Sequence, residues 1–409
     1  MRGMKEIRSY LDTLRERNDA KCAQCVEGWP RIKFFAVKGS RPFWQRVKAV
    51  RRIMELIPQY GWAVRRKTGV GIARQVWQQY LGAVKYGMPP DEYYQYAIYN
   101  DFKRLGQYIA KMQWAKLLRA LFAKQDAGDK EVVDDKRVSN YHFRERGLPI
   151  IPILAEFEQG EVTSREWSGA SRLPPVDLFS KPADADRGRG ARRWKVRHEH
   201  LYEAEDGSLV SQDKLVEKLR QQSKKQPVIL QRRVANHAEL QTLTGDTLVS
   251  LRIITMRPPR SKAQYLIGRI SLPVGDEIGT NGGFNVLRAP IEASTGRLGA
   301  AYDQNDFARV MEPISVHPAT GERIAGFQLP DWDEAVDLAL RAHKTLPTIA
   351  LVGWDIAITP DGAVIIEGNS MPGADSPQVA HKSPLGGTQF PELYMANLKA
   401  ASSDAQPAL

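Results

Sequence analysis

The clearest pattern of apolar and polar positions in this chain lies between residues 352 and 369. Residues 352–358 are largely apolar, residues 360–362 read Pro-Asp-Gly, and residues 363–366 are apolar again. Pro, Asp and Gly together are typical of a turn, and short apolar runs on both sides of a turn are typical of strands. The pattern therefore predicts two short strands that pair across a tight turn.

The first 125 residues show a different spacing, in which apolar residues recur every three or four positions. Two stretches carry this spacing, and in the first of them basic residues fill the opposite face. The apolar positions are Phe43, Val47, Val50, Ile53, Met54 and Ile57 in the first stretch, and Phe102, Leu105, Ile109, Met112, Leu117 and Leu121 in the second. We expect a basic amphipathic helix near residue 50 and a second long helix over residues 102–121.

The pattern changes near residue 126, where short β-rich runs alternate with helical stretches such as 213–222 and 331–343. This alternation is typical of an α+β fold. A chain of 409 residues is also too long for one small core. We expect a basic helical domain over residues 1–125, two α+β lobes over residues 126–230 and 231–396, and a frayed tail over residues 397–409.

The net charge of +12 is concentrated in the N-terminal third of the chain. Residues 1–124 contain 25 Lys and Arg against 9 Asp and Glu, a balance of +16, whereas the remaining residues contain 34 against 38, a balance of −4. A basic surface of this kind attracts phosphates, anionic lipid or an acidic polymer. A solvated helical surface would have the same composition, so both interpretations stay open.

Features that would direct the chain out of the cytosol are lacking in the sequence. No apolar run reaches the roughly 18 residues of a transmembrane helix, and the first residues contain no apolar core of the signal-peptide type. Cys22 and Cys25 are interpreted as reduced thiols, because cytosolic proteins rarely keep disulfides. We expect a cytoplasmic protein, and peripheral association with the inner membrane through the basic N-terminal domain is a further hypothesis.

Three polar residues interrupt the predicted strand pair: Asp355, Glu367 and Asn369. Side chains two positions apart on a strand share a face, so Glu367 and Asn369 point the same way, and pairing across the turn would bring Asp355 beside them. Two carboxylates and an amide oxygen form an all-oxygen site that suits Mg²⁺, with Mn²⁺ as the alternative ion. A surface hairpin with solvated acids is the competing interpretation.

Two cationic residues lie in apolar stretches, where a charge needs an anionic partner. Lys181 ends the run VDLFSKP, and Arg252 lies within the β-branched run SLRIIT. Between them, residues 183–193 read ADADRGRGARR. Glycines let backbone N–H groups approach phosphate, and the arginines add positive charge, so this segment suits a phosphate-binding loop.

Taken in chain order, these pieces resemble the ATP-grasp superfamily, and most closely its sugar-transfer-associated branch, whose relatives include glutamate ligase-like proteins. The resemblance spans roughly residues 87–395. Its elements are DDK, LFSKP, the Gly- and Arg-rich loop, VILQRRV followed by NH, SLRIIT, TNGG and GWDIAITPDG with EGN. It implies an ATP-grasp fold, in which two α+β lobes grip ATP, preceded here by the basic, mainly helical N-terminal domain.

The resemblance also implies a role for each matching residue. Lysines and the loop would contact phosphate, the hinge after VIL would read adenine, and His237 would orient the ribose or cap a helix. The implied ATP-binding residues are Lys136, Lys181, Arg187, Gly188, Arg189, Gly190, Gln231, Arg232, Arg233, Val234 and His237. The implied catalytic residues are Lys181, Arg252, Arg269 and Asn281, and the implied Mg²⁺ ligands are Asp355, Glu367 and Asn369.

The activity that the resemblance implies is an ATP-dependent carboxylate–amine ligase that works through an acyl-phosphate. Its substrate would be a sugar, an amino acid or a peptide, in keeping with polysaccharide biosynthesis. Two alternatives stay open: an ATP-grasp kinase that phosphorylates a hydroxyl, and a non-catalytic protein that docks on a membrane or a polysaccharide assembly with a vestigial ATP site. Nucleic acid is not an expected partner, because the sequence contains no recognised nucleic-acid module.

Overall fold

A computed structural model of the chain describes residues 43–123, 126–166, 173–183, 190–275, 286–303 and 312–403. Cys22 and Cys25 therefore lie outside the described residues. No helix of the described residues is both long and apolar enough to cross a membrane.

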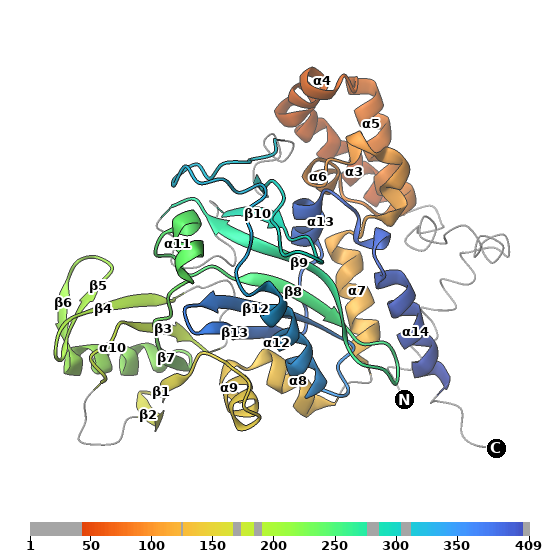
Figure 1. Cartoon of the computed structure of the whole chain (residues 1–409). Coiled ribbons are helices and arrows are strands. Elements are labelled where there is room, and N and C mark those ends of the chain that lie inside the picture. Colours follow the sequence, from red (N-terminus) through yellow and green to blue (C-terminus); the bar gives the residue numbers. More distant parts are fainter. Residues whose placement is uncertain are drawn as a thin grey trace, which may run out of the picture.

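The described residues form two antiparallel sheets, and Figure 1 shows the six-stranded sheet in the middle of the molecule and the seven-stranded sheet to one side of it. The seven-stranded sheet has the order β2-β1-β7-β3-β4-β5-β6, and the six-stranded sheet has the order β11-β10-β9-β8-β12-β13. The strands of the first are β1 (Ile153–Glu158), β2 (Glu161–Arg165), β3 (Leu178–Pro182), β4 (Arg192–His198), β5 (Leu201–Ala204), β6 (Leu209–Ser211) and β7 (Val228–Arg232). Those of the second are β8 (Leu251–Met256), β9 (Gln264–Pro273), β10 (Val286–Pro290), β11 (Tyr302–Asp303), β12 (Leu351–Thr359) and β13 (Gly362–Asn369).

Helices surround both sheets, and Figure 1 shows α3 to α6 gathered at one end of the molecule, away from the seven-stranded sheet. The α-helices are α3 (Phe43–Leu56), α4 (Trp62–Thr68), α5 (Ile72–Leu81), α6 (Pro90–Gln95), α7 (Lys111–Phe122), α8 (Ala127–Asp134), α9 (Lys136–Glu145), α10 (Gln212–Ser223), α11 (Ala238–Thr244), α12 (Trp332–Lys344), α13 (Asp375–His381) and α14 (Phe390–Ser403). Short 3₁₀ or π segments are η2 (Ile57–Gly61), η3 (Gly82–Tyr86), η4 (Ile98–Asn100), η5 (Phe102–Gln107) and η6 (Leu385–Gly387).

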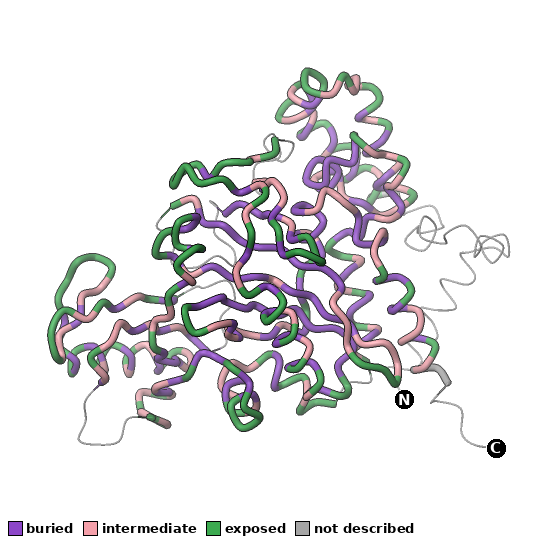
Figure 2. Tube along the Cα trace, viewed as in Figure 1, coloured by how far each residue is buried: buried purple, intermediate pink, exposed green. Residues whose placement is uncertain are grey.

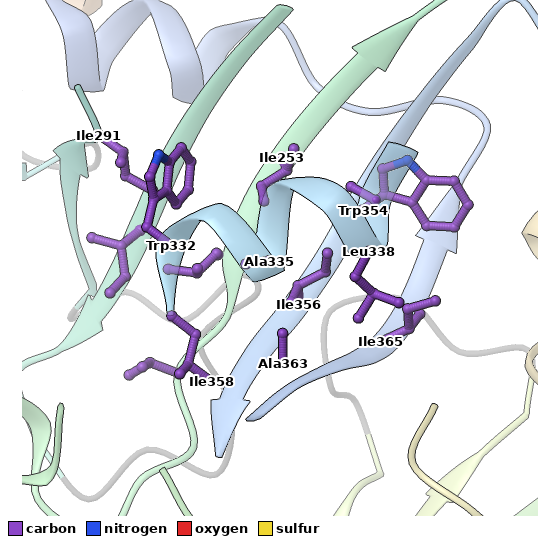
Figure 3. Close-up of a cluster of buried hydrophobic side chains, with 14 of the residues drawn as sticks. Ile253, Ile291, Trp332, Ala335, Leu338, Trp354, Ile356, Ile358, Ala363 and Ile365 are labelled. Atoms are coloured by element: carbon purple, nitrogen blue, oxygen red, sulfur yellow. The ribbon is translucent and has the colours of Figure 1, made fainter. Parts of the chain in front are cut away.

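On one face of the six-stranded sheet, apolar side chains pack against α12 (Figure 3). Odd positions of β8 and even positions of β12 supply this face, as the two-residue repeat of a strand requires. Ile253, Trp354 and Ile356 are completely buried there against Ala335 and Leu338 of α12. Acidic residues in the first turn of α12 and basic residues in its last turn complement the helix dipole. Figure 2 shows the same sheet as the most continuously buried part of the chain.

The predicted strand pair over residues 352–369 is confirmed. It consists of β12 and β13, which pair antiparallel with Asp355 opposite Glu367 and Gly353 opposite Asn369. The prediction of an α+β fold is confirmed as well, because helices and two antiparallel sheets make up the described chain.

The basic amphipathic helix near residue 50 exists as α3. Of its predicted apolar positions Ile53 is buried, but the prediction was wrong for Val47, Val50 and Met54, which are exposed. Packing against α5 and α6 buries Ala49, Ile53 and Leu56. Val47 and Met54 are 41% and 64% exposed, and Trp44 is 73% exposed. The spacing of apolar residues fits two faces of this helix, and the neighbouring helices determine which one is buried.

The single long helix predicted over residues 102–121 was also wrong, because η5 and α7 are separate. The backbone between them is extended at Tyr108 and Ala110. The side-chain amide of Gln378 holds Ile109 there: its oxygen accepts from the Ile109 N–H at 3.0 Å, and its nitrogen donates to the Ile109 carbonyl at 3.0 Å. A residue 269 positions away thus replaces the helical hydrogen bonds.

Truncation of Leu338 to alanine tests the packing of α12. We expect Leu338→Ala to lower the free energy of unfolding by about 2–5 kcal/mol, because the side chain is completely buried and its removal leaves a cavity. Lys344→Ala, at the exposed end of the same helix, should change it by less than about 0.5 kcal/mol. Urea denaturation followed by circular dichroism measures both, and equal effects would contradict the packing described.

Candidate active site

A row of charged side chains crosses the six-stranded sheet on the face opposite α12. The strand register places Glu367 opposite Asp355, Asp355 opposite Arg252, and Arg252 opposite Arg269. Directly opposite residues on antiparallel strands share a face and have Cβ atoms about 4.5–5.5 Å apart. Alternation along each strand therefore gives one apolar side and one charged side, and the charged side has acids at β12 and β13 and arginines at β8 and β9.

The centre of the row is a buried ion pair between Arg252 and Asp355. The Arg252 Nε donates to Asp355 Oδ1 at 2.6 Å, and one Nη donates to Oδ2 at 2.9 Å, so both carboxylate oxygens are engaged. Asp355 is completely buried, and the Arg252 side chain is 12% exposed. Burial by itself would lower the pKa of Arg252, but the charge and the hydrogen bonds of Asp355 outweigh burial and raise that pKa. The prediction that Arg252 needs an anionic partner is confirmed.

Glu367 lies between this pair and two lysines. Burial, followed by repulsion from Asp355, raises the pKa of Glu367, whereas the positive charges of Lys181 and Lys136 oppose the rise. The Lys136 Nζ lies 3.8 Å from Glu367 Oε2. An additional cation beside Glu367 and Asp355 would relieve the repulsion between the two carboxylates.

Lys136 connects the two sheets. It begins α9, which Asp135 caps by accepting from the N–H groups of Arg137 and Val138. This helix packs on the six-stranded sheet through Phe143, whose ring centre lies 5.7 Å from that of Trp354. The Lys136 Nζ in turn donates at 3.1 Å to the Ala183 carbonyl, which directly follows β3 of the seven-stranded sheet.

Lys181 approaches the same acids from β3 of the seven-stranded sheet. Burial lowers the pKa of Lys181 to about 8; Glu367 and Asp355 raise it, and Lys136 contributes to lowering it. The two sheets and α9 thus bring two lysines, two carboxylates and an arginine together. These five residues come from four separate segments: α9, β3, β8 and the hairpin of β12 and β13.

Arg269 and Arg288 extend the cationic part of the row. Arg288 lies on β10 opposite Ser271, and one Nη of Arg269 donates to the Ser271 hydroxyl, so both arginines occupy the charged face. They are only 5% and 6% exposed. Burial, followed by repulsion from Arg288 and Arg252, lowers the pKa of Arg269 well below its ordinary value. Burial and repulsion from Arg252 lower the pKa of Arg288 to about 10.

Sequence reasoning missed Arg288. The signal was present, because Arg288 lies in the apolar run VLRAPI just as Arg252 lies in SLRIIT. The same argument, that a charge within an apolar strand needs a partner, would have selected it.

The residues predicted for the hinge are spread over several environments. Gln231 is buried, and its amide nitrogen donates to the Ile151 carbonyl at 3.0 Å. Arg232 is exposed, and Arg233 forms an ion pair with Asp177 at 3.2 Å. Val234 is partly buried in the loop after β7.

His237, for which the sequence left two roles open, occupies the N-cap of α11. Its ring nitrogen accepts from the Glu239 N–H at 3.3 Å. Gly190, at the end of the predicted phosphate loop, has φ +77°, a conformation that favours glycine. Arg187, Gly188, Arg189 and Asn281 lie outside the described residues.

The predicted metal ligands share one edge of the site. Asn369 follows Glu367 by two positions on β13, and Asp355 faces Glu367 from β12. No cluster of three or more His, Cys, Asp or Glu suited to a metal occurs within the described ranges. Two carboxylates, one of them with a raised pKa, and one amide oxygen nevertheless form a donor set that suits Mg²⁺ when substrate oxygens complete it.

Comparison with known proteins identifies the family. The family described as "Sugar-transfer associated ATP-grasp" matches residues 123–389, which is more than half of the chain. The protein belongs to this family. No match was found among curated proteins.

Solved structures of similar architecture include several ATP-grasp ligases. They are a D-alanine–D-alanine ligase from Bacillus anthracis complexed with ATP (12% identity, 69% of this chain and 71% of that chain, TM-score 0.37), a D-alanine–D-alanine ligase from Coxiella burnetii (11%, 73% and 67%, TM-score 0.38) and the VanG D-Ala:D-Ser ligase from Enterococcus faecalis (11%, 66% and 64%, TM-score 0.36). These scores are low, and the assignment rests on the family match.

Removal of the Asp355 charge should destabilise the site. We expect Asp355→Asn to lower the free energy of unfolding by about 3 kcal/mol, because it leaves the Arg252 guanidinium buried without its charge partner. The double variant Arg252→Met with Asp355→Leu should recover most of this loss, because neither charge is then buried. Asp337→Asn, which breaks an exposed pair with Arg341, should lower it by less than about 1 kcal/mol. Urea denaturation measures all three, and an Asp355→Asn variant as stable as Asp337→Asn would contradict the structural role of the pair.

Proposed function

We propose that this protein is an ATP-dependent ligase that joins a carboxylate to an amine through an acyl-phosphate. The observation that supports this most directly is the meeting of Lys136 and Lys181 with Glu367, Asp355 and Arg252 at one point between the two sheets. The cations suit the phosphates of ATP, and the pair of carboxylates suits the Mg²⁺ that a triphosphate binds. The family match is consistent with this chemistry, although a fold by itself does not determine a reaction.

The reaction consists of two transfers. A carboxylate oxygen of the substrate attacks the γ-phosphorus of ATP, and the bond to the β,γ-bridging oxygen breaks to release ADP. The amine then attacks the acyl carbon, phosphate leaves, and the amine gives up a proton as the amide forms. Neither transfer needs a nucleophilic side chain, so catalysis depends on positioning and on charge.

The side chains divide this work between the two lobes. Lys181 would neutralise phosphate oxygens from β3, Lys136 from the start of α9, and Arg252 from β8. Asp355 holds Arg252 in one orientation through both of its carboxylate oxygens, so the guanidinium needs no reorganisation during the reaction. The reacting carboxylate of the substrate would lie against Arg252, and Arg269, next to it on β9, would help to hold the substrate.

Asp355, Glu367 and Asn369 would hold Mg²⁺, or Mn²⁺ in its place. The ion supplies charge neutralisation for the phosphates when it is bound. Without an ion, the raised pKa of Glu367 reflects its burial and its repulsion from Asp355. We expect Mg²⁺ to bring that pKa back down.

The direct test is phosphate release from ATP and Mg²⁺ across a panel of carboxylates, each with and without amines. We expect ADP and phosphate to appear only when both substrates are present. Asp355→Asn combined with Glu367→Gln should reduce this rate by about 10²-fold or more, because it removes both carboxylates of the donor set. The matched control is Asp213→Asn with Glu217→Gln, which makes the same chemical change on the exposed side of α10 and should leave the rate unchanged.

Two other outcomes would contradict the ligase. ATP turnover with a hydroxyl compound and no amine, giving a stable phosphorylated product, would identify a kinase. Absence of turnover together with absence of ATP-dependent thermal stabilisation would indicate a vestigial site and a docking role.

The lowered pKa of Lys181 predicts a pH dependence of ATP binding. With a pKa of about 8 in the free protein, more than half of the Lys181 side chains are uncharged above pH 8. Bound triphosphate favours the charged form and raises that pKa, so binding should take up protons between about pH 8 and 9 and should weaken as the pH rises. Below pH 7 the uptake should vanish, because Lys181 is already charged.

Calorimetry of ATP binding in two buffers with different ionisation enthalpies measures this uptake. Lys181→Arg keeps the positive charge at every pH of the test and should abolish it. Equal uptake in the wild type and in Lys181→Arg would show that another group is responsible.

A further inference from the structure

On the charged face of the six-stranded sheet, the row of cationic side chains continues beyond Arg252. In the six-stranded sheet, β9 and β10 follow β8, and their register places Arg269 beside Arg252 and Arg288 diagonally beside Arg269. Asp355 already occupies Arg252 with both of its oxygens. Arg252 is enough to face the γ-phosphate and the reacting carboxylate. The guanidinium groups of Arg269 and Arg288 are therefore additional to what the proposed reaction requires.

The native contacts do not satisfy the guanidinium of Arg269. Its hydrogen-bond acceptor is the hydroxyl of Ser271, a neutral group, and its Nε is buried without a partner. A buried donor without a partner is unfavourable, and a guanidinium is the group that most readily takes a carboxylate or phosphate with two hydrogen bonds. Asp355 and Asp375 are close enough to affect the pKa of Arg269, yet that pKa stays well below its ordinary value because burial and the neighbouring arginines outweigh them.

Lys382 lies at the β11 end of this row of cationic residues. It follows α13 in a left-handed conformation, with φ +46°. Its Nζ lies 4.2 Å from the ring centre of Tyr302, and Tyr302 is the register partner of Arg288 on β11. The end of α13 is fixed to β9 because the His381 ring donates to the Gly268 carbonyl at 2.7 Å, next to Arg269. Burial lowers the pKa of Lys382 to about 7.

We propose that Arg269, Arg288 and Lys382 form a second anion subsite, so that the carboxylic acid substrate carries a second anionic group, a carboxylate or a phosphate. This inference rests on the proposed ligase function, because it places the reacting carboxylate at Arg252. Neighbouring strands lie about 4.8 Å apart, so an anion between β9 and β10 would be roughly 7 Å from β8. A short chain of a few bonds between the two anionic groups spans that distance.

The test measures binding to the full chain without turnover. The probes are glutarate, its monomethyl ester, which has the same chain and a single charge, and 4-phosphonobutyrate, which has a phosphonate in place of one carboxylate. We expect glutarate or 4-phosphonobutyrate to bind about tenfold or more tightly than the ester, because one additional charged hydrogen-bond set forms. The tighter of the two identifies the class of the second group. Equal affinity of the ester and both dianions for the wild type would overturn the proposal.

Variants assign the preference to the subsite. Arg288→Gln should reduce the dianion preference to less than about threefold, and Lys262→Gln, an exposed charge between β8 and β9, should leave it unchanged. If Arg288→Gln does not fold, as judged by its thermal unfolding, Lys382→Gln tests the same subsite from the chain after α13. A full dianion preference retained in a folded Arg288→Gln variant and in Lys382→Gln would show that the second group binds elsewhere.

Failure of the subsite and failure of the ligase are distinguishable. If the subsite is wrong and the ligase is right, ATP turnover proceeds with monoanionic acids and the ester binds as well as glutarate. If the ligase is wrong and the subsite is right, the dianion preference and its loss in Arg288→Gln persist without any turnover.

Discussion

The buried ion pair between Arg252 and Asp355 is the contact on which the rest of the site depends. It joins β8 to β12 in the centre of the six-stranded sheet and fixes both carboxylate oxygens of Asp355. On one side, burial together with repulsion from Asp355 raises the pKa of Glu367. On the other side, burial together with repulsion from neighbouring arginines, Arg252 among them, lowers the pKa of Arg269 and of Arg288. Each neighbour is thereby poised to accept an added charge of the opposite sign.

This polarity has a simple structural origin. A strand presents alternate residues to opposite faces, so one face of the sheet can be mainly apolar against α12 while the other carries a row of charge. The apolar face supplies the stability, and the charged face contains groups whose mutual repulsion is unfavourable in the absence of ligands. The lysines complete the arrangement only because α9 and β3 bring them from outside the sheet. The site therefore lies where α9 and β3 meet the six-stranded sheet.

The features of the fold and the site that depend on a local sequence pattern could be predicted from the sequence. The hairpin of β12 and β13, with Asp355 beside Glu367, followed from apolar runs around Pro-Asp-Gly. The need of Arg252 for an anionic partner followed from its apolar neighbours, although the identity of that partner did not. The buried face of α3 and the interruption at Ile109 could not be predicted, because α5, α6 and the distant Gln378 determine them. Arg288 was overlooked although its local pattern matched that of Arg252.

The sequence by itself determined which segments form strands, which residues bring charge into them, and, through an ordered set of motifs, the family to which the chain belongs. Tertiary structure alone decided which charges meet. Asp355 and Arg252 are 103 residues apart, and Lys136 reaches Ala183 across 47 residues. The physical reason is that alternation fixes the face of a side chain within its own strand, whereas strand order and register fix its neighbours. Strand order and register depend on long-range packing, which no local pattern encodes.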